Sequence, residues 1–537
     1  MSPEPTPSQR ERLAAAVLGG TLVLAALGWL APRYVYHWDE VQLTLAIRHF
    51  DLAWHHPQPP GYYLFVILSR LAAPFVSGDA PPGRLVSSLF AGLGMASISW
   101  LLPRGLGRAA HWLFTLAAAA FFVLSPLVWF YAEGSLTYVA EGVVWLWIAA
   151  AIAARPQGRR LLLGAFLVGL CAGLRQTLAL WSASLVLVVA LRDRSWIRAR
   201  QLPALALAFA CGVAVWLGPM VVETGGWSIY WQASRLIVFR NIWSKSVFAA
   251  APLGVLSSRL PLMAGDVALG LGPWLGLGFA VALLRCQRRF APRLRPLDPI
   301  LLSAALAFVF YLVLLYATSG YALSVVVPCF AFALLGAARM VAGRSPSRAV
   351  WGAGAVALGA VALQLWLPGG HLTGSAGRLG ERRQRDQILS ARFDAIRQAF
   401  SPESTVLATR KETWEFAFRH VMFYLPEFPT IQIMRDPLML GLSDGQPFLT
   451  AQNQDVWASG PDGLTLDRLA PFDETRELRT VVFMQPAQAA DAFDPSCRPL
   501  VSALRTSAGE LLPILRVPPA VRVLARSGRL YCVSAPL

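Results

Sequence analysis

Apolar runs of about 17–23 residues recur along roughly the first 370 positions of this 537-residue chain, and each is long enough to cross a bilayer core of roughly 30 Å. Only 14% of the residues are charged, whereas a soluble domain averages roughly a quarter. The pattern predicts a polytopic α-helical membrane protein. No small-residue cleavage site follows the first run, so we do not expect it to be a signal peptide.

The formal net charge of +17 comes largely from arginines in the short segments between these runs. The clusters are Arg104 and Arg108; Arg155, Arg159 and Arg160; Arg192, Arg194, Arg198 and Arg200; Arg285, Arg288, Arg289, Arg293 and Arg295; and Arg344 and Arg348. This distribution is the positive-inside signal, so these loops are expected in the cytoplasm. The same placement argues against a nucleic-acid partner.

Eleven crossings are predicted, near 13–31, 84–102, 112–126, 136–154, 161–173, 177–191, 203–221, 262–284, 298–317, 322–342 and 349–367. The arms 161–173 and 177–191 form a hairpin whose apex, Arg175–Gln176, points away from the cytoplasm. The run 61–77 is short, carries Arg70 and is interrupted by Pro74, so it is expected to be juxtamembrane or re-entrant. The odd count places the N-terminus inside and everything after residue 367 outside.

After residue 367 the apolar runs stop and charged residues and prolines become frequent. Segment 378–400 predicts an amphipathic helix with Ile388, Phe393, Ile396 and Phe400 near one face. Five short strands are predicted at 405–409, 430–434, 479–484, 513–517 and 529–534. We therefore expect a transmembrane domain over 1–367 and an external α/β domain over 368–537.

Two of the six cysteines, Cys497 and Cys532, lie in this external domain, where an oxidising compartment would favour a disulfide between them. A buried free thiol at Cys532 is the alternative. The other four cysteines lie in or beside apolar runs and are interpreted as packing residues.

The first external loop carries the densest polar cluster, HWDEVQLTLAIRHFDLAWHHPQPPGYY at 37–63. Asp39 and Glu40 begin a predicted helix, and its apolar face is expected to lie along the membrane interface. That face comprises Leu43, Ala46, Ile47 and Phe50. The loop ends in His55, His56, Gln58 and a Pro-Pro pair.

The WDE and HHPQPPGYY segments resemble the GT-C glycosyltransferases of family 39 type, which include the lipid A aminoarabinose transferases and the protein O-mannosyltransferases. SPLVWFYAEGSLTYVAE, AGLRQTLALW and SGYALSVVVP follow in family-like order, so the resemblance covers roughly residues 10–370. It implies a GT-C fold and a multi-pass protein of the inner or plasma membrane. The implied activity is transfer of a hexose or pentose from a polyprenyl-phosphate-linked donor to a glycan, lipid or protein acceptor on the external face.

The resemblance and the chemistry together suggest roles for particular residues. An attacking hydroxyl or amine must lose a proton, which suggests Asp39 as general base with Glu40 as its partner. The leaving lipid phosphate needs cationic or hydrogen-bonding groups; the candidates are Arg175 first, then Gln58, His56, Arg235 and Arg240. The candidates for contacts to the acceptor or sugar are His55, Glu133, Tyr62 and Tyr321.

Two positions depart from the family pattern. Close relatives often have Lys or His before Pro-Pro, where this chain has Gln58, and Gln supplies no charge. The acid after the Ser125-Pro126 step is often an Asp, whereas Glu133 and Glu141 are the nearest acids here. A divalent metal would involve Asp39 and His56, although no H-x-x-x-H spacing is present.

Other interpretations fit the same residues. Asp39 and Glu40 would also stabilise a helix N-terminus, and Arg175 would also suit a side chain that snorkels to the interface. Trp227, Tyr230, Trp231 and Trp243 are most simply an aromatic belt. A transporter or channel with an external accessory domain is the competing function, and the broken 161–191 hairpin would suit one.

The predicted topology can be checked by accessibility labelling of two introduced cysteines in intact cells. We expect Ser375→Cys to react with an impermeant thiol reagent from outside, and Gly107→Cys to react only after the membrane is permeabilised. Labelling of Gly107→Cys from outside would contradict the odd count and make 61–77 a full crossing.

Overall fold

The computed structural model describes residues 5–52, 56–76, 80–154, 158–180, 184, 186, 201–249, 252–288, 290–342, 379–410, 418–433, 464–465, 479–486, 493–518, 521–526 and 529–534. The chain forms two compact units. The helical unit comprises Met1–Ala31, Pro60–Ser77 and Pro81–Arg378, and the α/β unit comprises Pro32–Pro59, Gly78–Ala80 and Leu379–Leu537. The first loop, 32–59, thus groups with the C-terminal part of the chain, and the predicted boundary at 367 lies outside the described residues.

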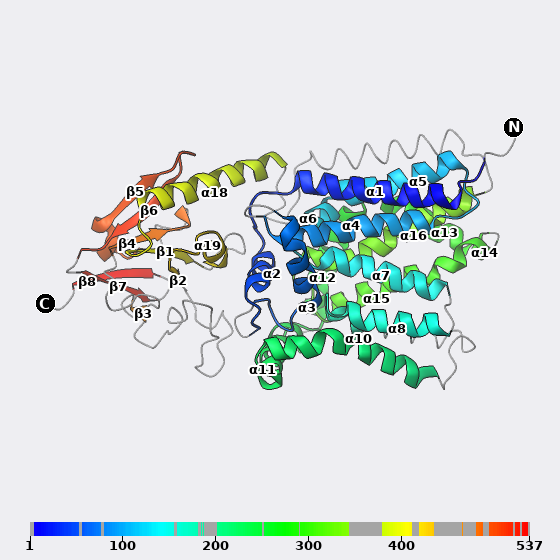
Figure 1. The fold of residues 1–537 in the computed structure, drawn as a ribbon, viewed down its shortest axis with the longest axis horizontal. Helices are drawn as coiled ribbons and strands as arrows, with labels where there is room; N and C mark the ends of the chain where they lie inside the picture. The colour runs from blue at the N-terminus through cyan, green and yellow to red at the C-terminus, as the bar shows by residue number, and fades with distance from the viewer. Residues whose placement is uncertain are drawn as a thin grey trace. The chain divides into compact units, whose positions relative to one another are not determined.

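The longer helices of the helical unit run roughly side by side (Figure 1). Its helices are α1 (Gln9–Leu30), α3 (Tyr63–Ala72), η1 (Ala73–Phe75), α4 (Pro82–Leu101), α5 (Arg108–Leu124), α6 (Pro126–Ala132), α7 (Tyr138–Ala153), α8 (Arg159–Cys171), α10 (Leu202–Glu223), α11 (Trp227–Ile237), η3 (Val238–Trp243), α12 (Pro252–Leu271), α13 (Trp274–Cys286), α14 (Ala291–Leu294), η4 (Arg295–Leu297), α15 (Asp298–Val313), η5 (Ser319–Ala322) and α16 (Leu323–Val341).

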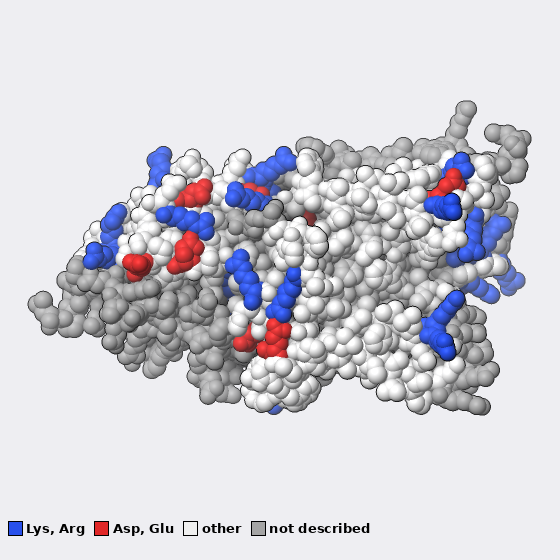
Figure 2. Space-filling view, in the orientation of Figure 1, with Lys and Arg blue, Asp and Glu red and all other residues white. Residues whose placement is uncertain are grey.

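Basic side chains tie helix ends together at one end of this unit. Arg12 of α1 donates to the carbonyl oxygens of Trp100 and Leu102 at the end of α4, at 2.8 and 2.6 Å. A bidentate bond joins Arg285 at the end of α13 to Asp298 at the start of α15. Figure 2 shows Lys and Arg gathered at this end, near α14, and an uncharged surface along the helices. This is the charge pattern that the arginine-rich loops predicted.

Helices α8 and α10 lie parallel in close contact. A Cβ added at Gly169 would meet the Phe209 carbonyl oxygen at 2.2 Å, and one added at Gly212 would meet that of Phe166 at 2.1 Å. The Trp216 indole N–H donates to the Gly169 carbonyl oxygen at 2.9 Å. The predicted hairpin 161–173/177–191 requires this parallel arrangement. If the second arm returns to the side where α8 begins, the next helix, α10, must run parallel to α8. Most of the second arm lies outside the described residues.

Helix α3 has 10 residues, about 15 Å, so it is too short to cross a bilayer. Its first turn meets the end of α8, because the Leu64 N–H donates to the Gly173 carbonyl oxygen at 2.9 Å. Its last turn meets the end of α10, where Arg70 and Glu223 form an ion pair at 2.7 Å. Since both contacts lie at the same end of the parallel pair, α3 lies across those helix ends, as a juxtamembrane segment would.

The run 262–284, predicted as one crossing, is divided between two helices, because α12 and α13 meet at an angle of 97°. The break falls at Gly272, with φ of +51°, and Pro273, which has no N–H to continue the ladder. A second bend of 69° separates α5 from α6 at Ser125–Pro126. The Ser125 hydroxyl donates to the Gly270 carbonyl oxygen at 2.6 Å, so a side chain at one bend satisfies a backbone carbonyl group beside the other.

Five helices among the described residues are long and apolar enough to cross a membrane, or seven if each bent pair is one span. Helix α7 is shorter, with 16 residues, and the predicted run 349–367 lies outside the described residues. The protein is therefore a mostly helical, multi-pass membrane protein, while the count of eleven stays a prediction.

The α/β unit is built on a five-stranded sheet of order β2-β1-β4-β6-β5, and a three-stranded sheet of order β3-β7-β8 accompanies it. Its elements are α2 (Trp38–Arg48), α18 (Leu379–Ala399), β1 (Thr405–Arg410), α19 (Phe418–Tyr424), β2 (Thr430–Ile433), β3 (Leu464–Thr465), β4 (Thr480–Phe483), η10 (Pro495–Leu500), β5 (Val501–Arg505), β6 (Leu511–Arg516), β7 (Val521–Arg526) and β8 (Arg529–Ser534). Strands β2, β1 and β4 are parallel, and the other described pairs are antiparallel.

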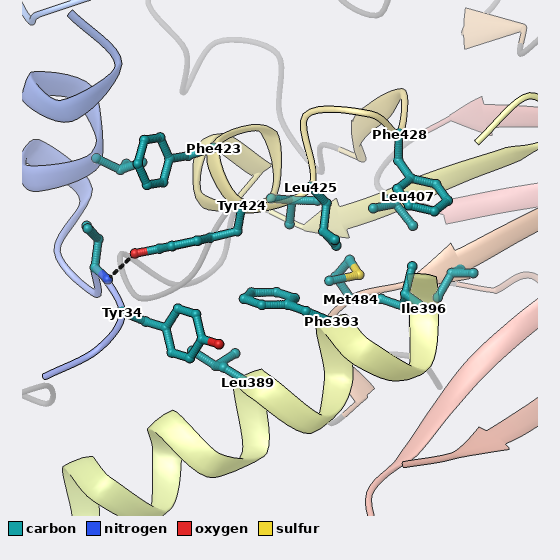
Figure 3. Close-up of a cluster of buried hydrophobic side chains, with 14 of the residues drawn as sticks. Tyr34, Leu389, Phe393, Ile396, Leu407, Phe423, Tyr424, Leu425, Phe428 and Met484 are labelled. Atoms are coloured by element: carbon teal, nitrogen blue, oxygen red, sulfur yellow. Dashed lines mark hydrogen bonds between the residues drawn. The ribbon is translucent and has the colours of Figure 1, made fainter. Parts of the chain in front are cut away.

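Alternating residues of the central strands face two separate cores. Leu407 and Val482 pack with α2, α18 and α19, whereas Val481 and Phe483 pack with residues of η10 and the smaller sheet. All five predicted strands are present. Strands β3, β5 and β7 were not predicted, and Leu389 takes the core position expected for Ile388, beside Phe393 and Ile396 (Figure 3).

Cys497 and Cys532 form the disulfide that the sequence suggested, with Cα atoms 5.0 Å apart. It joins η10 to β8 within the α/β unit. The cysteines in the apolar runs, Cys171, Cys211, Cys286 and Cys329, are free.

The close contact of α8 and α10 predicts a specific sensitivity to size. We expect Gly212→Ala to destabilise the protein by about 1–3 kcal/mol, because the new methyl group meets backbone atoms that cannot rotate away. The control is Gly218→Ala on the same helix, where an added Cβ meets nothing within 4 Å. Thermal unfolding of the purified protein in detergent compares the two, and equal melting temperatures would contradict the packing described.

Candidate functional site

The hairpin apex residue Arg175 lies in a buried ion pair within the helical unit. Its Nε is 2.9 Å from Oε2 of Glu141 in the first turn of α7, and its side chain is only 6% exposed. Its Nη1 donates to the Thr137 hydroxyl at 3.1 Å. A snorkelling arginine would reach water, so this geometry contradicts that interpretation of Arg175.

The Glu141 carboxylate is held on both oxygens. Oε1 accepts hydrogen bonds from the hydroxyls of Tyr311 on α15, at 2.5 Å, and Thr177, at 2.9 Å, while Oε2 faces Arg175. Thr137 and Glu141 share one face of α7 because they are four residues apart. The pair is therefore fixed by residues from three segments that are distant in sequence.

Three tyrosine rings surround the guanidinium of Arg175. Its Cζ lies 4.3 Å from the ring centroid of Tyr138, 4.9 Å from that of Tyr321 and 5.7 Å from that of Tyr62. Such contacts contribute about 0.5–2 kcal/mol each, more when desolvated. No described residue accepts a hydrogen bond from Nη2, so one face of this cation keeps donor capacity.

A second layer of polar aromatic side chains surrounds these rings. Tyr321 contacts Tyr311 at a centroid distance of 4.5 Å and Tyr316 at 6.3 Å. The Tyr316 hydroxyl donates to the carboxylate of Asp266 on α12. The Tyr131 hydroxyl on α6 hydrogen-bonds the Thr318 hydroxyl at 2.8 Å. Both bent spans and the turn before α16 therefore contribute to one polar cluster.

The hairpin apex also holds the bend that leads into α3. The Gln176 amide lies 3.5 Å from the Pro60 carbonyl oxygen, and Arg175 covers the Tyr62 ring. Residue 61 must be glycine, because its φ is +118° and an added Cβ would meet Met220 Sδ at 2.5 Å. The end of the Pro-Pro loop is thus anchored beside the ion pair.

Asp39 and Glu40 lie in the first turn of α2, as predicted, in the α/β unit. The side chain of His37 caps this helix, since its Nδ1 accepts a hydrogen bond from the Asp39 N–H at 3.1 Å. Asp39 is half-buried, whereas Glu40 is only 5% exposed. A carboxylate that must meet a substrate needs access, which favours Asp39 over Glu40.

Helix α2 has more than the one apolar face predicted. Leu43, Ala46 and Phe50 are buried, as are Val41 and Leu45, which join the core of the α/β unit. The location of the helix along a membrane interface stays a prediction.

The remaining candidates are spread over both units. His56 is buried and pairs through its backbone with Asp51, and Gln58 is half-buried; both belong to the α/β unit. In the helical unit, Glu133 is buried at the end of α6, and Arg235 is exposed on α11. His55 and the side chain of Arg240 lie outside the described residues.

Within the described part of the chain, no three His, Cys, Asp or Glu side chains come together as a metal site requires. Since His55 is not described, metal binding by Asp39 and His56 stays a prediction. The exposed Trp227, Trp231 and Trp243 suit the aromatic-belt interpretation of that segment.

No protein-family model matches the sequence, and no curated protein matches it significantly. The crystal structure of ArnT from Cupriavidus metallidurans bound to undecaprenyl phosphate is similar, with a TM-score of 0.57 over 93% of this chain and 97% of that one. ArnT from the same organism in the apo state has the same coverage and a TM-score of 0.58. The chain has the GT-C fold of ArnT.

The sequence identity to both ArnT structures is 15%, so what is shared is the fold. The likeness to ArnT extends over most of the chain, which means that it includes more than the residues that carried the sequence resemblance. The predicted GT-C fold is confirmed.

The sequence suggested Arg175 as a phosphate ligand and, separately, Tyr62 and Tyr321 as acceptor or sugar contacts. The structure places the three side chains together. Tyr138 and Tyr311 were missed, and Glu141 was named without a role. The available signal was the TYVAE segment at the start of α7, where Thr137, Tyr138 and Glu141 fall on adjacent positions of one helical face.

The buried pair predicts a non-additive response to substitution. Glu141→Leu alone should cost about 3–5 kcal/mol, because it leaves the Arg175 charge buried without its counterion. The double variant Glu141→Leu/Arg175→Met should be more stable than Glu141→Leu. Thermal unfolding measures both.

The control is the exposed pair Arg397–Glu427, with a separation of 2.7 Å and side chains 48% and 35% exposed. Its removal should cost no more than about 1 kcal/mol. A double variant at the buried site that is less stable than Glu141→Leu alone would contradict the interpretation.

Proposed function

We propose that the protein is a membrane glycosyltransferase that moves a sugar from a polyprenyl-phosphate-linked donor to an acceptor on the external face. The observation that carries the proposal is the fold shared with ArnT over 93% of the chain. One of the ArnT structures contains undecaprenyl phosphate. The buried polar cluster supports it further, because ionisable groups within a membrane unit are costly and usually functional.

In this proposal Arg175 contacts the donor phosphate. The departing lipid phosphate gains negative charge, which a fixed cation in a dry setting stabilises without reorganisation. Glu141 and Thr137 hold Nε and Nη1, so Nη2 remains to donate. Tyr62 and Tyr321 flank the same guanidinium and provide flat faces for a sugar next to the phosphate.

The proposed general base is Asp39, with Glu40 as its partner. Asp39 lies in the first turn of α2 and is half-buried, so its carboxylate keeps access to a substrate. The secondary phosphate candidates are Gln58, His56, Arg235 and Arg240, and the secondary acceptor contacts are His55 and Glu133. A divalent metal held by Asp39 and His56 is an optional addition to this scheme.

We also propose an inner or plasma membrane location, with a cytoplasmic N-terminus and the C-terminal region outside. Two observations support this orientation. The arginine-rich helix ends gather at one end of the helical unit, and a disulfide in the α/β unit suits an oxidising compartment.

The decisive test is transfer of label from a panel of radiolabelled polyprenyl-phosphate sugars in membranes containing the full-length protein. Asp39→Asn keeps size and hydrogen bonding but removes the base, so turnover should fall by roughly 10²–10⁴. Donor binding should change little in Asp39→Asn, whereas Arg175→Ala should weaken it, with Arg175→Lys restoring only part because the planar fork is lost.

The control is Asp394→Asn, a carboxylate exposed on α18. Turnover of Asp39→Asn within about tenfold of the unmodified protein would mean that another group takes the proton. Flux of labelled solute through proteoliposomes, with no transfer to any acceptor, would favour the transporter.

A further inference from the structure

The segment that leads into α2 is hydrogen-bonded to one carboxylate of the C-terminal helix α18. Oδ2 of Asp386 accepts from the Arg33 backbone N–H at 2.8 Å. Oδ1 accepts from the Tyr34 backbone N–H at 3.2 Å and from the Tyr36 hydroxyl at 2.8 Å. Burial, together with the Asp386 charge, raises the pKa of Tyr36, so its hydroxyl stays protonated and continues to donate.

The next backbone group in this segment is held from α19. The Val35 N–H donates to the Tyr424 hydroxyl at 2.6 Å, as the dashed line in Figure 3 shows. The Tyr34 ring packs edge-on against Phe393 and Tyr424, with centroid distances of 5.2 and 5.0 Å. Three consecutive backbone donors, at residues 33, 34 and 35, are therefore all satisfied by two side chains of the C-terminal region.

Both ends of α2 also contact α19. The Arg419 guanidinium lies 5.5 Å from the ring centroid of Trp38, the first residue of α2. The Arg48 guanidinium, at the last residue of α2, lies 4.6 Å from the ring centroid of Phe423. Between them, Val41 and Leu45 are buried in the core that α18 and α19 share. The helix is thus held at its start, middle and end.

We propose that Asp386 and Tyr424 are positioning residues for the transfer reaction, fixing the start of α2 and with it the carboxylates of Asp39 and Glu40. This inference rests on the proposed function and deepens it. It makes the α/β unit a working part of the transferase, because the acid-bearing helix is built into its core.

The physical reason lies in the short distance along the chain. Only His37 and Trp38 separate the last held residue, Tyr36, from Asp39, and each residue has two soft dihedrals. A reacting group must be held within about 0.5 Å of its productive position, and a displacement of about 1 Å can cost roughly 10²-fold in rate. Releasing residues 33–36 would let the first turn of α2 move by that much.

The test uses the full-length protein in detergent, with Asp386→Ala, Asp386→Asn and Tyr424→Phe compared with Asp394→Asn, an exposed carboxylate on the same helix. Two quantities are measured: kcat and donor KM for transfer, and amide hydrogen exchange of 38–48 against that of β1 and β4. We expect kcat of Asp386→Ala to fall roughly 10- to 100-fold with donor KM within about threefold. The kcat of Asp386→Asn and that of Tyr424→Phe should fall less than that of Asp386→Ala.

Exchange should accelerate in α2 and not in β1 or β4, and Asp394→Asn should change neither quantity. Unchanged exchange in α2, or an unchanged kcat, would overturn the proposal. Equal acceleration in α2, β1 and β4 would overturn it too, since Asp386 would then only stabilise the unit as a whole. Failure of the proposed function is distinguishable, because the unmodified protein would then transfer no label to any acceptor, whereas kcat retained in Asp386→Ala contradicts only the positioning role.

Discussion

The ion pair between Arg175 and Glu141 is the contact on which the centre of the helical unit depends. Two charges in a weakly polarisable interior are costly unless they are paired and further hydrogen bonds support them. Tyr311 and Thr177 donate to Glu141, Arg175 donates to Thr137, and the tyrosine rings cover the cation. The start of α7, the hairpin apex, α15, η5 and the bend into α3 converge there, so their relative positions follow from one electrostatic requirement.

Patterns within short segments of the sequence predicted much of the fold. Hydropathy and arginine placement identified most helices, and alternation identified five strands, because both signals are properties of short segments. Bends between helices were harder to predict, because hydropathy does not report a change of helix direction such as the one at Gly272–Pro273. The partners in the site were hardest. Thr137 and Arg175 are 38 positions apart, and Glu141 and Tyr311 are 170 apart, so only tertiary packing brings them together. Leu389 lies in the core where Ile388 was expected, because Leu389 is four residues before Phe393 and seven before Ile396, the spacing of one helical face.

The first external loop was assigned to the transmembrane domain over 1–367, because it directly follows the first apolar run. Its apolar residues suggested a single face toward the interface, yet Val41 and Leu45 form another toward the α/β core. Sequence pattern reports that a residue is apolar and not which neighbour it meets. The proposed chemistry therefore draws on both units. The candidate base, Asp39, belongs to the α/β unit, and the candidate phosphate ligand, Arg175, belongs to the helical unit together with the tyrosines around it.

The grouping of residues 32–59 with the C-terminal region also constrains how the chain can be made. Arg33 and Asp386, which are hydrogen-bonded, lie 353 positions apart. At synthesis rates of about 5–20 residues per second, roughly 20–70 s pass before the second partner exists. During that interval Val41, Leu45 and Tyr34 lack most of the core residues with which they pack in the folded unit. A chain that ended before α18 would therefore leave the acid-bearing loop without the surface on which it folds.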